Sequence, residues 1–129
     1  MSEAPDYAAL INAYFLAVDD ERIDDIVACF CDDATFDFPL AEEPVRGHAE
    51  LRAFFTAHTG RFTNHVDRVS RVLADDEGGI SELVFDATTT DGRTVHLENC
   101  NVYRFRDGKF AAVKVYGDSV TIRQQFGLE

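Results

Sequence analysis

The chain has 129 residues, 46% of them hydrophobic and 12% aromatic, which is enough for one domain with a substantial core. Its formal net charge of −12 argues against nucleic acids and anionic membranes as partners, because both are bound through clusters of lysine and arginine. No apolar run approaches the roughly 20 residues that span a bilayer, and the N-terminus lacks the basic region of a signal peptide. We therefore expect a cytoplasmic protein with a single domain over residues 1–129.

The first half of the chain has the periodicity of helices. Apolar residues recur at helical spacing over residues 6–18 and 22–31, and again after Gly47. Between them, residues 34–38 form a short apolar segment that ends at Pro39. Proline cannot donate to a β-ladder, so this segment is predicted to be a short strand that stops there.

Beyond Arg61 the pattern changes to that of strands. Four segments rich in apolar and β-branched residues follow, at 63–74, 80–89, 94–106 and 109–118. Asp91-Gly92 and Asp107-Gly108 separate the later segments and favour tight hairpins, because these residue types tolerate a positive φ. Residues 124–129 are a short tail that could close one end. Helices first and strands later predict an α+β fold, with the helices on one face of a curved antiparallel sheet.

Four short stretches carry a family resemblance: Phe30-Cys-Asp-Asp-Ala-Thr-Phe-Asp-Phe-Pro39, Pro44-Val-Arg-Gly47, Leu51-Arg-Ala-Phe-Phe55 and Val102-Tyr-Arg-Phe-Arg-Asp-Gly-Lys-Phe110. With the order of the elements, they resemble the nuclear transport factor 2-like superfamily. That superfamily includes ketosteroid isomerases, SnoaL-like polyketide cyclases, and scytalone and bile-acid dehydratases. The resemblance implies a cone-shaped α+β barrel with three N-terminal helices, a curved, mostly antiparallel sheet and an enclosed apolar pocket. It specifies the fold better than the function, because this fold also hosts binding and dimerisation domains.

The resemblance to the isomerases gives two residues a candidate role. Tyr14 matches the position of their oxyanion-hole tyrosine, and Asn101 matches that of a protonated aspartate which assists it. Both side chains can donate a hydrogen bond to an oxygen that gains negative charge. The alternatives are a core tyrosine with a satisfied hydroxyl, and an asparagine that binds neighbouring backbone.

One feature argues against steroid isomerase activity. The isomerase general base should precede Pro39, where this chain has Phe38. Asp37 is one position away, so strand alternation should direct it to the opposite face.

The dehydratase and dehydrochlorinase branch resembles the chain at two other residues. Those proteins carry an aspartate at the end of the first helix and a histidine near the start of the long strand, which here are Asp19 and His65. In that scheme Asp19 orients His65, and His65 removes a proton next to a carbonyl or leaving group. The alternatives are that Asp19 is a helix cap or solvated loop residue, and that His65 is a half-buried strand histidine.

The remaining histidines and the cysteines suggest no metal site. His48 should be exposed at the start of the third helix, His58 could touch the pocket, and His96 should face outward. Their spacing does not match a metal-binding motif. Cys29, Cys31 and Cys100 are interpreted as reduced structural thiols.

These residues lead to three functional hypotheses. The first is a cofactor-independent small-molecule lyase or isomerase, with Asp19 and His65 as the acid–base pair and Tyr14 with Asn101 polarising an oxygen. Its substrate would be mostly apolar, such as a polycyclic or terpenoid-like molecule, and no metal or other cofactor is expected. The predicted pocket walls are Phe36, Phe38, Phe54, Phe55, His58, Leu97, Asn99, Tyr103 and Tyr116. The second hypothesis is a non-catalytic ligand-binding or dimerisation domain. The third is an isomerase or cyclase with another base, such as Asp86.

A homodimer is also expected, through the outer face of the sheet. That face would otherwise expose Val102 together with Val113 or Val115. The resemblance supports this expectation, because the superfamily commonly pairs there.

Overall fold

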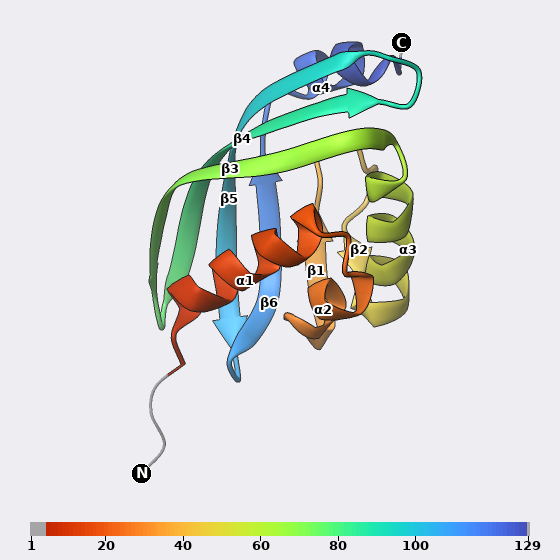
Figure 1. The fold of residues 1–129 in the computed structure, drawn as a ribbon. Helices are drawn as coiled ribbons and strands as arrows, with labels where there is room; N and C mark the ends of the chain where they lie inside the picture. The colour runs from red at the N-terminus through yellow and green to blue at the C-terminus, as the bar shows by residue number, and fades with distance from the viewer. Residues whose placement is uncertain (1–4, 129) are drawn as a thin grey trace.

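The computed structural model describes residues 5–128 and consists of helices packed against one curved sheet (Figure 1). The helices are α1 (Tyr7–Asp19), α2 (Ile23–Ala28), α3 (Gly47–Thr59) and α4 (Ser119–Phe126). The strands are β1 (Phe30–Asp37), β2 (Val45–Arg46), β3 (Phe62–Asp75), β4 (Gly78–Thr89), β5 (Thr94–Arg106) and β6 (Lys109–Tyr116). Within the described residues, no helix has the length and apolar character needed to cross a membrane.

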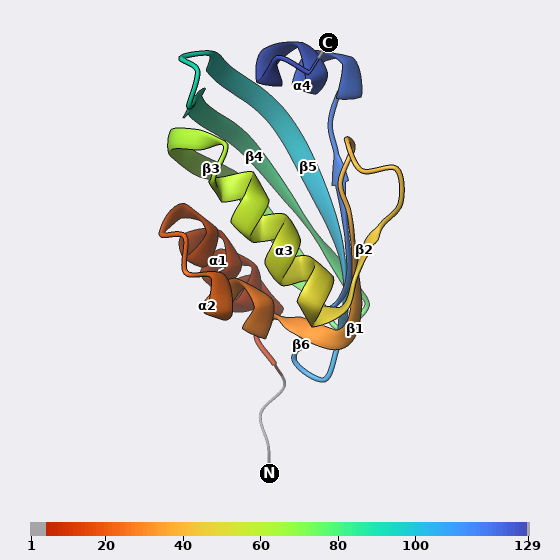
Figure 2. The same cartoon turned by 90° about the vertical axis from the view of Figure 1, so that its right-hand side faces the viewer.

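The strands form one sheet in the order β2-β1-β6-β5-β4-β3. Every neighbouring pair is antiparallel except β1 and β6, which run parallel with Phe36 opposite Val113. Figure 2 shows α1, α2 and α3 on one face of the curved sheet, with α4 at one end. The predicted α+β fold is therefore confirmed.

The first helix is fixed by its cap and by its buried face. Asp6 accepts a hydrogen bond from the Ala9 nitrogen at 3.0 Å, which satisfies one of the free N–H groups of the first turn. The helix then buries residues at helical spacing against the sheet, among them Ile11, Tyr14 and Val18. The end of α1 is thereby held beside β3.

The hairpin between β5 and β6 has the predicted Asp-Gly turn. Asp107 has φ 54° and Gly108 has φ 78°, so both central residues are left-handed as a mirror-image turn requires. Gly92, between β4 and β5, also has a positive φ of 88°.

Several element boundaries differ from the sequence predictions. The second helix ends at Ala28, and β1 already begins at Phe30 because its first residues pair with β6. The two-residue strand β2 was not predicted. The last strand ends at Tyr116, since Asp118 starts α4 by accepting hydrogen bonds from the nitrogens of Val120 and Thr121 at 3.0 and 3.3 Å. The expected tail is thus the end of a helix.

The core has two parts. The main cluster lies between the three N-terminal helices and the sheet, and it includes Tyr14, Phe36, Phe55 and Tyr103. A second cluster packs α4 against the far ends of the strands and consists of Phe62, Phe85, Ala87, Val95, Leu97, Ile122 and Phe126. The candidate site lies next to both clusters.

Candidate active site

A small cavity lies between α1, α3 and the concave face of the sheet. This inner cavity has a volume of about 50 Å³. Its lining is aromatic and aliphatic, interrupted by a few polar side chains: Tyr14, Phe15, Val18, Phe36, Phe38, Phe54, Phe55, His58, Asp67, Leu83, Asn99, Asn101 and Val115. Its volume holds a few water molecules, or the reacting end of a small ligand, but not a polycyclic molecule.

A larger hollow adjoins the inner cavity. This outer hollow has a volume of about 230 Å³ and is lined by Phe38, Leu40, Ala41, Phe54, Ala57, His58, Arg61 and Phe126. Because Phe38, Phe54 and His58 line both spaces, these three rings form the wall between them. Together the two spaces approach about 300 Å³, the lower end of the volumes typical of ligand sites.

The largest depression, about 730 Å³, lies elsewhere, around the β3–β4 hairpin, and its lining includes Leu73, Gly79 and Val102. It is a broad, open surface and holds none of the buried polar groups of the inner cavity.

The most perturbed acid of the site is Asp67. It lies on β3, and the nitrogen of its own backbone donates a hydrogen bond to Oδ1 of Asp19 at 2.9 Å. Burial raises the pKa of the Asp67 carboxyl well above its usual range. The negative charge of Asp19 and a hydrogen bond between the two carboxyl groups raise it further. Two carboxyl groups that hydrogen-bond must share a proton, so the pairing favours the protonated form of Asp67.

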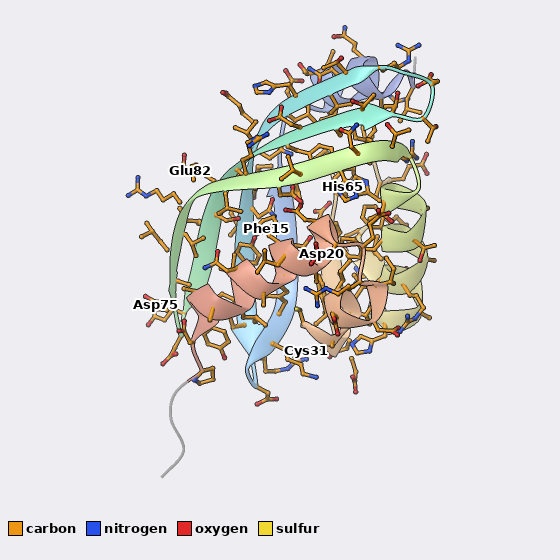
Figure 3. All side chains as sticks on the ribbon, in the orientation of Figure 1. Phe15, Asp20, Cys31, His65, Asp75 and Glu82 are labelled. Carbon is orange, nitrogen blue, oxygen red and sulfur yellow. The ribbon has the colours of Figure 1, made fainter. Side chains whose placement is uncertain are left out.

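The expected pair of Asp19 and His65 is not formed. The Asp19 carboxylate binds the backbone and carboxyl of Asp67, and no hydrogen bond within the described chain connects it to His65. The His65 side chain is only 4% exposed, and its Nε2 lies 3.7 Å from a carboxylate oxygen of Glu21. Figure 3 shows His65 on β3 close to the end of α1. A mechanism that requires Asp19 to orient His65 therefore lacks its central contact.

Tyr14 lies in the wall of the inner cavity. Its ring is almost fully buried and meets four phenylalanine rings, those of Phe15, Phe30, Phe55 and Phe110. Burial raises the pKa of the Tyr14 hydroxyl well above its usual value, and the nearby Tyr103 and Asp67 raise it further. The hydroxyl therefore keeps its proton and can act as a hydrogen-bond donor in the cavity.

Two asparagines on β5 present unpaired acceptors. Nδ2 of Asn101 donates to the Tyr103 hydroxyl at 3.2 Å, and that hydroxyl also shares a 2.8 Å hydrogen bond with Ser81. The side-chain oxygens of Asn101 and Asn99 are buried without a hydrogen-bond partner in the described chain. Buried polar atoms are rarely left unpaired, so the site has unused capacity for a donor.

His58 completes the polar set. Its imidazole lies among the rings of Phe38, Phe54, Phe62, Phe85 and Phe126, with centroid separations of 5.3 to 6.4 Å. Burial lowers its pKa to about 4, and the nearby charges of Arg61 and His65 add to the effect. The ring is therefore neutral at physiological pH.

The model of the SnoaL-like domain family matches residues 11–113, which is most of the chain. The chain belongs to the SnoaL-like domain family. A search of curated proteins found no match.

Solved structures share the fold at low sequence identity. TerC co-crystallised with polyporic acid has a TM-score of 0.82 and 17% identity, over 92% of this chain and 96% of TerC. A LEH-like epoxide hydrolase from M. tuberculosis has a TM-score of 0.77 and 18% identity, over 94% and 89% of the two chains. IdmH, a putative polyketide cyclase from Streptomyces antibioticus, has a TM-score of 0.76 and 19% identity, over 93% of this chain and 97% of IdmH. The resemblance to the nuclear transport factor 2-like superfamily is confirmed.

Asp67 is the residue of this SnoaL-like domain that sequence reasoning missed. It follows His65 by two positions and precedes Val69 by two, so all three share one face of β3. Because His65 was expected to face the pocket, the same alternation could have identified Asp67. Its partner Asp19 could not be identified in this way, because their contact depends on how α1 packs on the strand.

The predicted wall residues fall into two groups. Phe36, Phe38, Phe54, Phe55, His58 and Asn99 line the inner cavity together with Tyr14 and Asn101. Three others lie elsewhere. Leu97 is part of the core under α4, Tyr103 is buried behind Asn101, and Tyr116 is 50% exposed beneath the Lys114 ammonium group.

The alternative base, Asp86, lies on the outer face. It binds Nδ1 of His96 at 2.6 Å and Nε of Arg68 at 2.9 Å, and these contacts lower its pKa. Asp37 lies 4.0 Å from the Lys114 ammonium group, away from the cavity as strand alternation predicted. His48 binds the carbonyl oxygen of Phe30 at 2.8 Å. These residues do not contribute to the cavity.

All three cysteines are free, and no cluster of three metal-ligating side chains occurs among residues 5–128. On the outer face Val102 is exposed, but Val113 and Val115 are buried, which corrects the expectation that one of them lies outside.

Proposed function

We propose that this SnoaL-like domain is a small-molecule lyase or isomerase in which Asp67 is the general acid and base. The observation that supports it is a carboxyl group of raised pKa in a largely apolar cavity, beside the carboxyl group of Asp19 and on the same lining as Tyr14. A raised pKa keeps a carboxylic acid able to donate a proton at neutral pH. Structures of similar fold include an epoxide hydrolase and a putative polyketide cyclase, which is compatible with acid–base chemistry on small molecules.

A dehydration illustrates how one carboxyl group completes the cycle. The Asp67 proton passes to the departing hydroxyl group of the substrate, the C–O bond breaks, and water leaves. The resulting carboxylate removes a proton from the neighbouring carbon, and the C–H electron pair forms the double bond. Asp67 is then protonated again, so the reaction needs no cofactor. In an isomerisation, the same group takes the proton from one carbon and returns it to another.

Tyr14 and Asp19 have supporting roles in this proposal. The Tyr14 hydroxyl donates to a substrate oxygen that gains negative charge, where a donor held in an apolar site is most effective. Asp19 is a positioning residue, because it holds the backbone and carboxyl of Asp67 and does not itself line the cavity. The side-chain oxygens of Asn99 and Asn101 accept hydrogen bonds from the substrate.

A non-catalytic binding domain is the second candidate. The small inner cavity and the unpaired asparagine oxygens favour it, since both suit a bound ligand without any reaction. Pairing of two copies through the outer face is part of the same proposal. Leu73, Val102 and Tyr116 are exposed there, and light scattering on the purified protein tests whether it is a dimer.

The test of the main proposal uses a conjugation assay. Aryl β-hydroxy ketones report dehydration and β,γ-unsaturated ketones report isomerisation, because both products are conjugated enones with a strong ultraviolet absorbance. We expect Asp67→Asn to reduce turnover by at least about 100-fold, the usual contribution of a general acid or base. Asp86→Asn, on the outer face, should leave turnover unchanged. Turnover that survives Asp67→Asn would overturn the assignment, and binding without turnover by the unmodified protein would favour the second candidate.

A further inference from the structure

The outer hollow is apolar except for two side chains, and the only one of them that is charged is Arg61. Arg61 follows α3 directly, and its backbone carbonyl accepts a hydrogen bond from the Thr90 nitrogen at 2.9 Å. Its guanidinium carbon lies 5.9 Å from the centre of the Phe126 ring. The backbone of Arg61 is therefore held in place while its charged group lies over an aromatic wall of the hollow.

Arg61 has no carboxylate partner within residues 5–128, although the chain is strongly acidic. Several other arginines form such pairs, namely Arg22 with Asp25, Arg52 with Asp24, Arg68 with Asp86, and Arg106 with Asp33, whereas Arg104, like Arg61, has none in the described chain. None of the residues that line the outer hollow is acidic. Arg61 also borders a neighbouring hollow that contains Asp91, but the carboxylate of Asp91 pairs with Arg93. The guanidinium group of Arg61 therefore keeps hydrogen-bonding capacity for a ligand.

We propose that the ligand of this cavity is a small apolar acid whose carboxylate binds Arg61. Its apolar body would lie in the outer hollow, and its reacting end would pass Phe38 and Phe54 into the inner cavity. This inference deepens the proposed function and rests on it for the identity of the reacting end. It assigns Arg61 as a specificity-determining residue.

The chemistry of the guanidinium group supports a carboxylate. Arginine presents a planar fork of donors that matches the two oxygens of a carboxylate, and such charge-assisted pairs are among the stronger hydrogen bonds in proteins. Arg61 is itself exposed to solvent, so the carboxylate can reach the guanidinium group from the mouth of the hollow. The neutral ring of His58, on the same wall, does not compete for the anion.

The size of the two spaces limits the body of the acid. An outer hollow of about 230 Å³ and an inner cavity of about 50 Å³ suit one aromatic ring with a short chain rather than a fused ring system. Phenylacetate, 3-phenylpropionate and 4-phenylbutyrate are therefore suitable probes, each compared with its neutral amide. The series varies the distance between the carboxylate and the ring.

Binding is measured by calorimetry and by the shifts of backbone amide signals in the full chain. We expect at least one carboxylate to bind about tenfold more tightly than its amide, and Arg61→Gln to remove that preference. A tenfold change corresponds to about 1.4 kcal/mol, within the range of a hydrogen bond to a charged group. Arg104→Gln is the matched control, because Arg104 is an exposed arginine on β5 outside both spaces.

Three results would overturn the inference. These are the absence of saturable binding by every carboxylate, equal affinity for acid and amide, and an acid preference that persists in Arg61→Gln. The melting temperature of Arg61→Gln is measured in parallel and should match that of the Arg104→Gln control, since the Arg61 side chain makes no ion pair in the described chain. If Arg61→Gln binds the neutral amides as tightly as the unmodified protein does, the site is still folded in this variant.

The same variants separate this inference from the proposed function. Asp67→Asn should leave the acid preference intact, because Asp67 does not line the outer hollow. If Asp67→Asn retains turnover but Arg61→Gln loses the acid preference, the assignment of Asp67 fails and the carboxylate site stands. If Asp67→Asn loses turnover but Arg61→Gln keeps the acid preference, the acid–base assignment stands and the carboxylate site fails.

Discussion

The carboxylate of Asp19 accepts a hydrogen bond from the backbone nitrogen of Asp67 at 2.9 Å and thereby ties the end of α1 to β3. Burial raises the pKa of the Asp67 carboxyl, and the negative charge of Asp19 raises it further. One side chain thus positions the acid of the cavity and adds to the effect of burial on its pKa. The candidate site therefore consists of two carboxyl groups from elements far apart in the sequence.

Asp67→Asn should make the protein more stable at neutral pH than the unmodified chain. In the unfolded chain an aspartate has a pKa of about 3.9, whereas in the folded protein the pKa of Asp67 is raised. The folded state then binds more protons than the unfolded state, so the stability contributed by Asp67 falls as the pH rises from about 4 through the raised pKa. Urea unfolding from pH 4 to 8 measures this, and a difference between the two proteins that does not grow with pH would contradict it.

Asp19→Asn should lower the pKa of Asp67 without releasing its backbone. The amide oxygen of asparagine can still accept the hydrogen bond from the Asp67 nitrogen, but the negative charge that raises the pKa is removed. Burial remains, so the pKa should stay above the usual range. Carbon NMR of the Asp67 carboxyl follows the titration. Asp20→Asn, at the exposed end of the same helix, serves as the control and should leave the curve unchanged.

His58→Phe should stabilise the protein on the acid side of neutrality. The pKa of His58 is lowered from 6.5 to about 4 in the folded protein. The stability that the neutral ring contributes is therefore fully present above pH 6.5 and is lost as the pH falls toward 4. Phenylalanine removes this loss, which reaches up to about 3 kcal/mol for a shift of this size. Because the Asp67 effect has the opposite sign in the same range, the unmodified protein should show the flatter profile. Parallel profiles for the two proteins between pH 4 and 6.5 would contradict the burial of a neutral ring.

Tyr103→Phe should destabilise the protein by about 1 to 3 kcal/mol, because it removes a hydroxyl that is bonded to Ser81 and Asn101 and leaves buried polar groups unpaired. The matched control is Tyr116→Phe, since the Tyr116 side chain is half exposed and makes no such bond. Its effect should be within about 0.5 kcal/mol. Equal effects of the two substitutions in denaturant unfolding would show that the Tyr103 network contributes nothing.

Features set by local chemistry were predictable from the sequence. The Asp107-Gly108 turn follows from the backbone preferences of those two residue types, and the buried position of Tyr14 follows from the apolar stripe of α1. The partner of Asp19 was not predictable, because α1 and β3 meet only in the folded chain. Sequence reasoning paired Asp19 with His65, and in the structure it binds Asp67, two residues further along the same face.

The placement of Tyr116 was missed for a different reason. Arg104 pairs with Ala112 and Phe105 pairs with Phe110, so Ala111 is an extra residue on β6. A bulge of this kind reverses which residues face the core beyond it. Phe110 is buried before the bulge and Val113 and Val115 are buried after it, which sends Tyr116 outward. Simple alternation from Phe110 places Tyr116 inside, so one inserted residue accounts for the error.

The parallel pairing of β1 with β6 has a consequence for how the chain reaches its native state. Every other strand pair joins neighbours in sequence order, whereas this one joins residues near 30–37 to residues near 110–114. Closing so long a loop is slow compared with forming hairpins, so the β3–β6 meander can assemble before β1 and β2 dock. During synthesis from the N-terminus, β1 must wait until nearly the whole chain has left the ribosome. The helices α1 and α3 therefore receive their complete sheet, and the cavity its final walls, only in the last stage of folding.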